Sequence, residues 1–99
     1  MNNKNYQDHF FKEAKKFGYR SRSAFKLIEL NKKFKFLKNG INILDVGSFP
    51  GGWCQVIKNK IKNGKIIGID LKKMEKIQGV NFIKGDFLND KTKIIILEY

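Results

Sequence analysis

The segment from Gly47 to Trp53, GSFPGGW, directly follows the apolar run INILDV and contains three glycines. Gly47, Gly51 and Gly52 permit a tight turn and let the backbone approach a ligand without a Cβ in between. A helix that starts after this loop would present unpaired N–H groups, which suit an anionic group such as a carboxylate or a phosphate. The loop therefore predicts a binding site for a small molecule.

Two acidic residues follow at the ends of the next two apolar runs. Asp70 ends the run KIIGID, eighteen residues after Gly52, and Asp86 follows VNFIK and Gly85. An acid about twenty residues beyond such a loop accepts hydrogen bonds from a ribose diol in nucleotide-binding folds, which favours an adenosine-containing cofactor. The loop has the form G-x-x-x-G-G, and Pro50 lacks the amide that a pyrophosphate could use, so dinucleotides are disfavoured.

The predicted secondary structure around these residues follows a β-α-β order. We expect strands at 41–46, 65–70 and 80–84, and a helix at 55–62 between the first two. Short apolar runs rich in β-branched residues are typical of buried parallel strands. Ligands of such doubly wound α/β folds bind at the carboxyl ends of the strands, where the loop and both acids lie.

Two helices are expected before the first strand. Apolar residues at helical spacing predict one over 7–17 and another that begins after Ser21 or Ser23 and ends near residue 33. Both arginines of the chain, Arg20 and Arg22, precede or open this second helix. Because a guanidinium can fork onto phosphate oxygens and an ammonium cannot, the arginines suit contact with phosphate groups.

The composition fits one small intracellular domain. The 99 residues are 41% hydrophobic, and 21 basic and 9 acidic residues give a net charge of +12, which favours a polyanionic partner such as nucleic acid. Abundant Lys, Asn and Ile also fit a genome rich in A and T. A single cysteine, Cys54, supplies neither a disulfide nor a metal-ligand set, so we expect a reducing compartment, cytoplasmic or mitochondrial, and no metal. No run approaches the roughly 18 apolar residues of a membrane span.

Three motifs occur together in one known family. GYRSRSAFKLIEL, ILDVGSFPGGW and GVNFIKGDF resemble, in order and spacing, the N-terminal half of the FtsJ-type RNA ribose 2′-O-methyltransferases. The likeness extends from Tyr6 to about Asp90, and the third motif is most similar to the ribosomal-RNA branch. It implies an incomplete Rossmann-like α/β fold, with a helical RNA-binding segment at 1–40 and the first half of the cofactor-binding domain at 41–99.

The resemblance also implies the chemistry. The cofactor would be S-adenosylmethionine, with Gly51 and Trp53 near its methionine end, Asp70 at the ribose and Asp86 near the adenine. Lys26 resembles the first member of the family's Lys-Asp-Lys-Glu catalytic tetrad, and it would position or polarise the ribose 2′-oxygen. The implied substrate is a uridine 2′-hydroxyl of large-subunit ribosomal RNA.

The sequence departs from the family pattern in the loop. Ser48-Phe49 stands where the family usually has two small residues, which leaves the packing of the loop against the cofactor open. The rest of the tetrad would follow Tyr99, so we expect these 99 residues to be inactive alone.

The C-terminal stretch TKIIILEY has strand propensity. The family nevertheless implies a helix that starts near Asp90, which we favour, and the strand at 41–46 would then have an unpaired edge. Two other functions stay open, a non-catalytic basic RNA-binding module and half of a nucleotide-dependent oxidoreductase.

Overall fold

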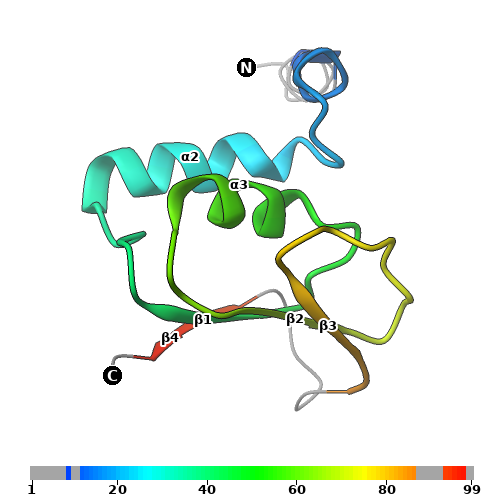
Figure 1. Ribbon diagram of the computed structural model, residues 1–99. Helices are drawn as coiled ribbons and strands as arrows, with labels where there is room; N and C mark the ends of the chain where they lie inside the picture. The colour runs from blue at the N-terminus through cyan, green and yellow to red at the C-terminus, as the bar shows by residue number, and fades with distance from the viewer. Residues whose placement is uncertain (1–8, 10–11, 87–92, 98–99) are drawn as a thin grey trace.

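The computed structural model describes residue 9 and residues 12–86 and 93–97. A helical stretch at 12–17 precedes the first complete element. The elements are, in chain order, α2 (Ser23–Phe34), β1 (Asn42–Val46), α3 (Gly52–Lys60), β2 (Ile66–Asp70), β3 (Asn81–Lys84) and β4 (Lys93–Leu97). Figure 1 shows that α2 and α3 cover the same face of the sheet.

The strands form one sheet in the order β3-β2-β1-β4. β1 pairs in parallel with β2, and β2 pairs in parallel with β3. The three strands predicted at 41–46, 65–70 and 80–84 are confirmed to within one residue at each end, as is the α/β class. The carboxyl ends of these strands therefore meet at one edge, where the loop after β1 lies.

The helix expected from near Asp90 is wrong for residues 93–97, which form β4. β4 pairs with β1 in antiparallel orientation, from Asn42 opposite Leu97 to Val46 opposite Lys93. The expected open edge of β1 is therefore also wrong. The physical reason is local, because three consecutive β-branched isoleucines favour a pleated strand, and Ile94 and Ile96 pack against the core. The expected helix start at Asp90 lies outside the described residues.

The core fills the space between the two helices and the sheet. It is made of buried side chains from α2, α3, β1 and β2, together with two residues of the connection between β2 and β3: Ala24, Leu27, Ile43, Cys54, Val56, Ile57, Ile66, Met74 and Ile77. The connection over 71–80 contains no helix, so Met74 and Ile77 cover the sheet beside α3. Burial of these apolar side chains fixes α3, and with it the loop that leads into it.

Both helices begin at positions that matter for the site. α3 starts at Gly52, three residues earlier than predicted, so the glycine loop leads into it directly. The residue that caps α2 is Arg22, without a side-chain hydrogen bond, and the hydroxyls of Ser21 and Ser23 bond to each other instead. In the described part of the chain, no helix has the length and apolarity needed to cross a membrane.

Candidate functional site

A small pocket of about 100 Å³ lies at the carboxyl end of β1. Two stretches of the chain line it. One comprises the end of β1, the loop and the start of α3, and the other comprises the residues that precede and open α2: Ser21, Ser23, Asp45, Gly47, Ser48, Phe49, Pro50, Gly52 and Trp53. The structure therefore brings together three of the predicted cofactor residues, Gly47, Gly52 and Trp53. It also places beside them the serines of the arginine-containing segment.

The loop needs its glycines for backbone reasons. Gly47 has φ +77° and donates its N–H to the carbonyl of Ile69 at 2.8 Å, and Gly51 has φ +120°. These values lie where L side chains are strained, so the predicted tight turn is confirmed. Gly52 packs against Ser21 so closely that a Cβ would overlap the Ser21 hydroxyl. The close approach at Gly52 is thus to the protein itself.

Asp70 ends β2 and holds the loop through its carboxylate. Oδ2 accepts the N–H of Phe49 and Oδ1 accepts the N–H of Lys72, each at 2.9 Å. Asp70 is half-buried, and each carboxylate oxygen can accept a further hydrogen bond. The side chain can therefore support the loop and still accept from a diol.

Asp86 lies beside Asp70 at the same edge of the sheet. The N–H of Gly85 donates to the carbonyl of Asp70 at 2.9 Å, which joins the ends of β2 and β3. Asp86 follows directly and is exposed. The ends of the two strands are adjacent, as the sequence spacing indicated.

Two buried polar residues of the pocket were missed by the sequence analysis. Asp45 is fully buried, and its Oδ2 accepts a hydrogen bond from the Cys54 thiol at 3.3 Å. Its Oδ1 and the buried hydroxyl of Ser48 have no hydrogen-bond partner among the described residues. The sequence contained a signal for Asp45, an acid inside the apolar run INILDV that was read only as a strand.

The burial of Asp45 changes its acidity. Desolvation raises the pKa of Asp45 from 3.8 to about 7, the hydrogen bond from Cys54 opposes the rise, and the charge of Asp70 adds to it. Burial and the neighbouring Asp45 raise the pKa of the Cys54 thiol, and the charge of Arg20 opposes that rise. The pocket therefore holds a carboxyl group that changes charge near neutral pH.

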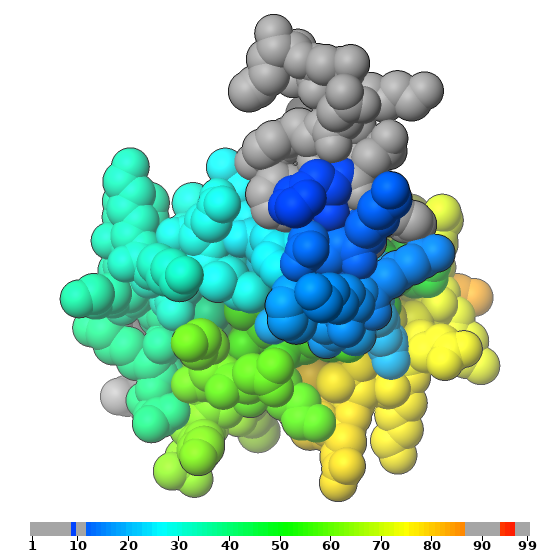
Figure 2. Space-filling view, turned by 90° about the horizontal axis from the view of Figure 1, so that it is seen from above, coloured from blue at the N-terminus to red at the C-terminus, as the bar shows by residue number. Residues whose placement is uncertain are grey.

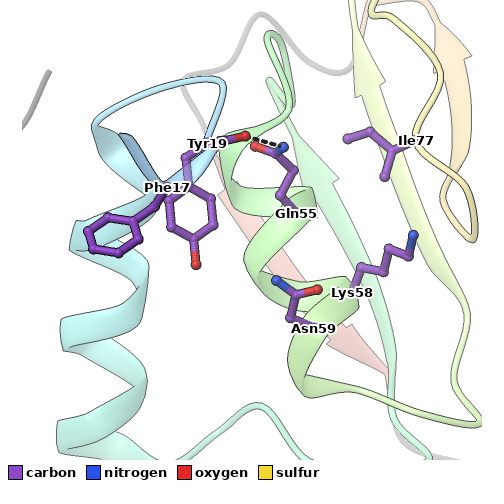
Figure 3. A pocket seen from close by; sticks show the side chains of 7 residues that line it. Phe17, Tyr19, Gln55, Lys58, Asn59 and Ile77 are labelled. Atoms are coloured by element: carbon purple, nitrogen blue, oxygen red, sulfur yellow. Dashed lines mark hydrogen bonds between the residues drawn. The ribbon is translucent and has the colours of Figure 1, made fainter. Parts of the chain in front are cut away.

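The segment before α2 is fixed to α3 by side-chain hydrogen bonds. The indole Nε1 of Trp53 donates to the carbonyl of Ser23 at 2.8 Å. The Gln55 side chain accepts the N–H of Arg20 at 2.8 Å and donates to the carbonyl of Gly18 at 3.1 Å. Figure 3 draws the second of these bonds as a dashed line. α3 therefore positions the backbone from Gly18 to Ser23 against residues 47–51, the cofactor loop between β1 and α3.

The guanidinium of Arg20 contacts backbone carbonyls. Nη1 donates to Pro50 at 3.1 Å and to Glu75 at 2.7 Å, and Nη2 donates to Lys76 at 3.1 Å. Figure 2 shows the N-terminal residues, in blue, beside the yellow connection between β2 and β3. Arg22 by contrast is exposed. The RNA-phosphate role of both arginines stays a prediction, but the structure gives Arg20 a second set of partners that the sequence did not indicate.

Residues 19–99 match the family model described as FtsJ-like methyltransferase. The chain belongs to the FtsJ-like methyltransferase family. This confirms the resemblance found in the three sequence motifs.

Named relatives are similar over most of this chain. The ribosomal RNA large subunit methyltransferase E of Methanocella arvoryzae is 47% identical over 92 residues, which are 93% of this chain and 36% of the relative. The protein of the same name from Buchnera aphidicola is 52% identical over 93 residues, 93% of this chain and 45% of the relative. A crystal structure described as a ribosomal RNA methyltransferase from Plasmodium falciparum has a TM-score of 0.65 and 55% identity, over 73% of this chain and 41% of that chain. The chain spans about two fifths of the length of the curated relatives it matches.

Lys26, which resembles the first tetrad residue of the FtsJ-like family, lies on α2 one turn beyond Ser23. Its side chain is exposed and does not line the 100 Å³ pocket. The next residue before it, Phe25, packs edge-on against Tyr19, with ring centroids 5.6 Å apart. Lys26 therefore lies at the surface near the pocket, where a large substrate can reach it.

A second hollow, of about 230 Å³, lies on the outer side of α3 (Figure 3). It is lined by aromatic, amide and apolar side chains: Phe17, Gly18, Tyr19, Gln55, Lys58, Asn59 and Ile77. It shares no lining residue with the first pocket and contains none of the predicted site residues. The second hollow is thus separate from the pocket at the carboxyl end of β1.

Proposed function

We propose that this chain supplies the cofactor pocket and part of the RNA-binding surface of an S-adenosylmethionine-dependent RNA ribose 2′-O-methyltransferase. The proposed substrate is a ribose 2′-hydroxyl of large-subunit ribosomal RNA, because the named relatives are ribosomal RNA large subunit methyltransferases. The FtsJ-type resemblance adds uridine as the proposed nucleotide. The observation that carries the proposal is the pocket at the carboxyl end of β1, with Asp70 at the end of the neighbouring strand.

The residues present fit the methionine end of this cofactor, which carries an ammonium and a carboxylate. Asp45 Oδ1 and the Ser48 hydroxyl are buried polar atoms without partners among the described residues, and an ammonium could donate to both. The first-turn N–H groups of α3, from Gly52 and Trp53 onward, suit the carboxylate. Asp45 and Ser48 thus suit the ammonium of the cofactor, and the start of α3 suits its carboxylate.

The adenosine part would lie along the strand ends. Asp70 retains acceptor capacity for the ribose hydroxyls, and Asp86 at the neighbouring strand end is assigned to the adenine. The bound cofactor supplies an electrophilic methyl group on its sulfonium. The contribution of this chain is to orient that group and to keep the loop around it in place.

Lys26 is assigned an electrostatic role toward the RNA. Its exposed ammonium near the mouth of the pocket would favour negative charge that develops on the ribose 2′-oxygen. Arg22 is also exposed, and with a net charge of +12 the chain attracts phosphate groups. We assign backbone contacts to Arg22 and alignment of the reacting oxygen to Lys26, which helps the reaction without accepting its proton.

The experiment that tests the function is calorimetric titration of the purified chain with S-adenosylmethionine, and separately with a nicotinamide dinucleotide and with a ribosomal RNA fragment. We expect saturable binding of S-adenosylmethionine that S-adenosylhomocysteine displaces. Preferential binding of the dinucleotide would support an oxidoreductase instead. Salt-dependent RNA binding without any cofactor binding would support a non-catalytic RNA-binding module.

A further inference from the structure

We propose that Arg20 is a positioning residue for the cofactor loop, and that its side chain sets the affinity of the pocket for S-adenosylmethionine. The proposal rests on the proposed function. It goes beyond the contact with RNA phosphate that the sequence predicts for this arginine, because it assigns the guanidinium to the protein's own backbone.

The Arg20 guanidinium donates to backbone carbonyls in two separate segments. A single nitrogen, Nη1, donates both to Pro50 in the cofactor loop and to Glu75 in the connection between β2 and β3, at 3.1 and 2.7 Å. Nη2 adds a bond to Lys76 at 3.1 Å. The guanidinium is a rigid planar fork, so three bonds to two segments fix the distance between those segments. Hydrogen bonds from a charged donor are stronger than bonds between neutral groups.

Gly51 packs against the Arg20 side chain. A Cβ at Gly51 would lie 3.1 Å from Arg20 Nη1, 3.2 Å from its Cδ and 2.9 Å from Ile77 Cδ1. Gly51 is buried and has φ +120°, in a region that favours glycine. The loop therefore rests directly on Arg20 and Ile77. Truncation of Arg20 would remove the surface that supports Gly51 and leave the carbonyl of Pro50 without its donor.

Arg20 is itself held in place by α3. Gln55 accepts the N–H of Arg20 and donates to the carbonyl of Gly18, so one amide fixes both sides of this short segment. Gln55 lies in the first turns of α3, the helix that the cofactor loop leads into. Arg20 is consequently anchored at its backbone and bonded at its far end, which makes it a bridge across the loop.

Arg22 provides a matched control within the same segment. It carries the same charge two residues away, but it is exposed and caps α2 without a side-chain hydrogen bond. If the two arginines act only through charge on RNA, their removal should have equal effects and should not change cofactor binding. If Arg20 positions the loop, only its removal should weaken the cofactor.

The test is calorimetry with S-adenosylmethionine on Arg20→Ala, Arg20→Lys and Arg22→Ala. We expect about tenfold weaker binding for Arg20→Ala, the effect of one lost charge-assisted bond, and less than about twofold for Arg22→Ala. Arg20→Lys should lie between them, because an ammonium keeps the charge but cannot bridge all three carbonyls. Equal affinities for the two alanine variants would overturn the proposal.

A second measurement keeps the test decisive if Arg20→Ala unfolds. Hydrogen exchange of the amides over 47–52, without cofactor, should be faster in Arg20→Lys than in the parent and unchanged in Arg22→Ala. Unchanged exchange in Arg20→Lys would overturn the proposal, whether or not the cofactor binds. Failure of the parent chain to bind S-adenosylmethionine would refute the proposed function, and faster exchange in Arg20→Lys alone would still support the hold on the loop.

In an active enzyme that contains this chain, Arg20→Ala should raise the KM for S-adenosylmethionine by about tenfold and change kcat by less than about threefold. The reason is that the lost contact supports binding of the cofactor rather than the methyl transfer. A fall in kcat with an unchanged KM would contradict a positioning role.

Discussion

Asp45 and Asp70 are carboxylates of neighbouring parallel strands, yet their surroundings are opposite. Asp70 is half-buried at the last position of β2, and both of its oxygens accept backbone N–H groups. Asp45 lies one residue before the end of β1, fully buried, with a thiol on one oxygen and no partner for the other among the described residues. Two residues of difference in the sheet register therefore separate a rim residue from a core residue.

The sheet register explains this difference. Asp45 lies opposite Gly68, two residues before Asp70, and the absent side chain of Gly68 leaves room for Ser48 and Cys54. A Cβ at Gly68 would lie 2.8 Å from the Ser48 hydroxyl oxygen. The carboxyl of Asp45 is thus covered by the loop that Asp70 holds in place. Asp70 holds the loop in place, and Asp45 is the buried acid whose pKa desolvation raises.

The largest difference predicted between Asp45 and Asp70 is in the pH dependence of the free energy of unfolding. The pKa of Asp45 is about 7 in the folded chain and 3.8 as its ordinary value, so ionisation disfavours folding. The free energy of unfolding should fall as the pH rises from about 4 to about 7, by up to about 4 kcal/mol, and level off above that. Asp45→Asn should abolish this part of the slope in urea denaturation at each pH. Asp70→Asn is the control and should retain most of it, because burial, the main cause of the raised pKa of Asp45, is still present.

Equal slopes in Asp45→Asn and the parent would mean that another group titrates in this range. The comparison between a buried and a rim carboxylate would then lose its energetic basis, although the geometry would stand.

A smaller effect is expected for Asp70 on the cofactor. Asp70→Ala should weaken binding of S-adenosylmethionine by about 1–3 kcal/mol, because a ribose hydroxyl loses a charged acceptor and the N–H groups of Phe49 and Lys72 lose theirs. Calorimetry measures the change. Asp86→Ala, at the exposed neighbouring strand end, should have a smaller effect. An affinity unaltered by Asp70→Ala would refute the ribose assignment.

Local patterns predicted the strands and the loop because the signals were local. The apolar runs at 41–46 and 65–70 specify the strands, and the glycines that follow the first run specify the turn, within a few residues. The prediction for 93–97 failed because the family pattern was preferred over β-propensity. The isoleucines there are β-branched, and pairing with β1 gives them a sheet to complete.

The contacts of Arg20 could not be read from the sequence. Its acceptors lie thirty to fifty-six residues away, in loops without regular structure, and backbone carbonyls leave no trace in residue type. The position of the arginines suggested a charged contact, and only the fold shows that one of them turns inward. Asp45 differs, because an acid within an apolar run already indicates a buried carboxylate.

The smallest predicted effect sharpens the comparison through Ser48, which covers Asp45. Its buried hydroxyl has no partner among the described residues, so Ser48→Ala should raise the free energy of unfolding of the cofactor-free chain by about 0.5–1 kcal/mol. The same change should weaken S-adenosylmethionine by a similar amount, because the hydroxyl would lie within reach of the ammonium. Ser21→Ala is the control, since the Ser21 hydroxyl already bonds to Ser23 at 2.7 Å, and its loss should lower stability instead. Lower stability for Ser48→Ala in chemical denaturation would mean that the hydroxyl is satisfied by the protein, and the buried pair would then be a structural feature of the core rather than part of the cofactor site.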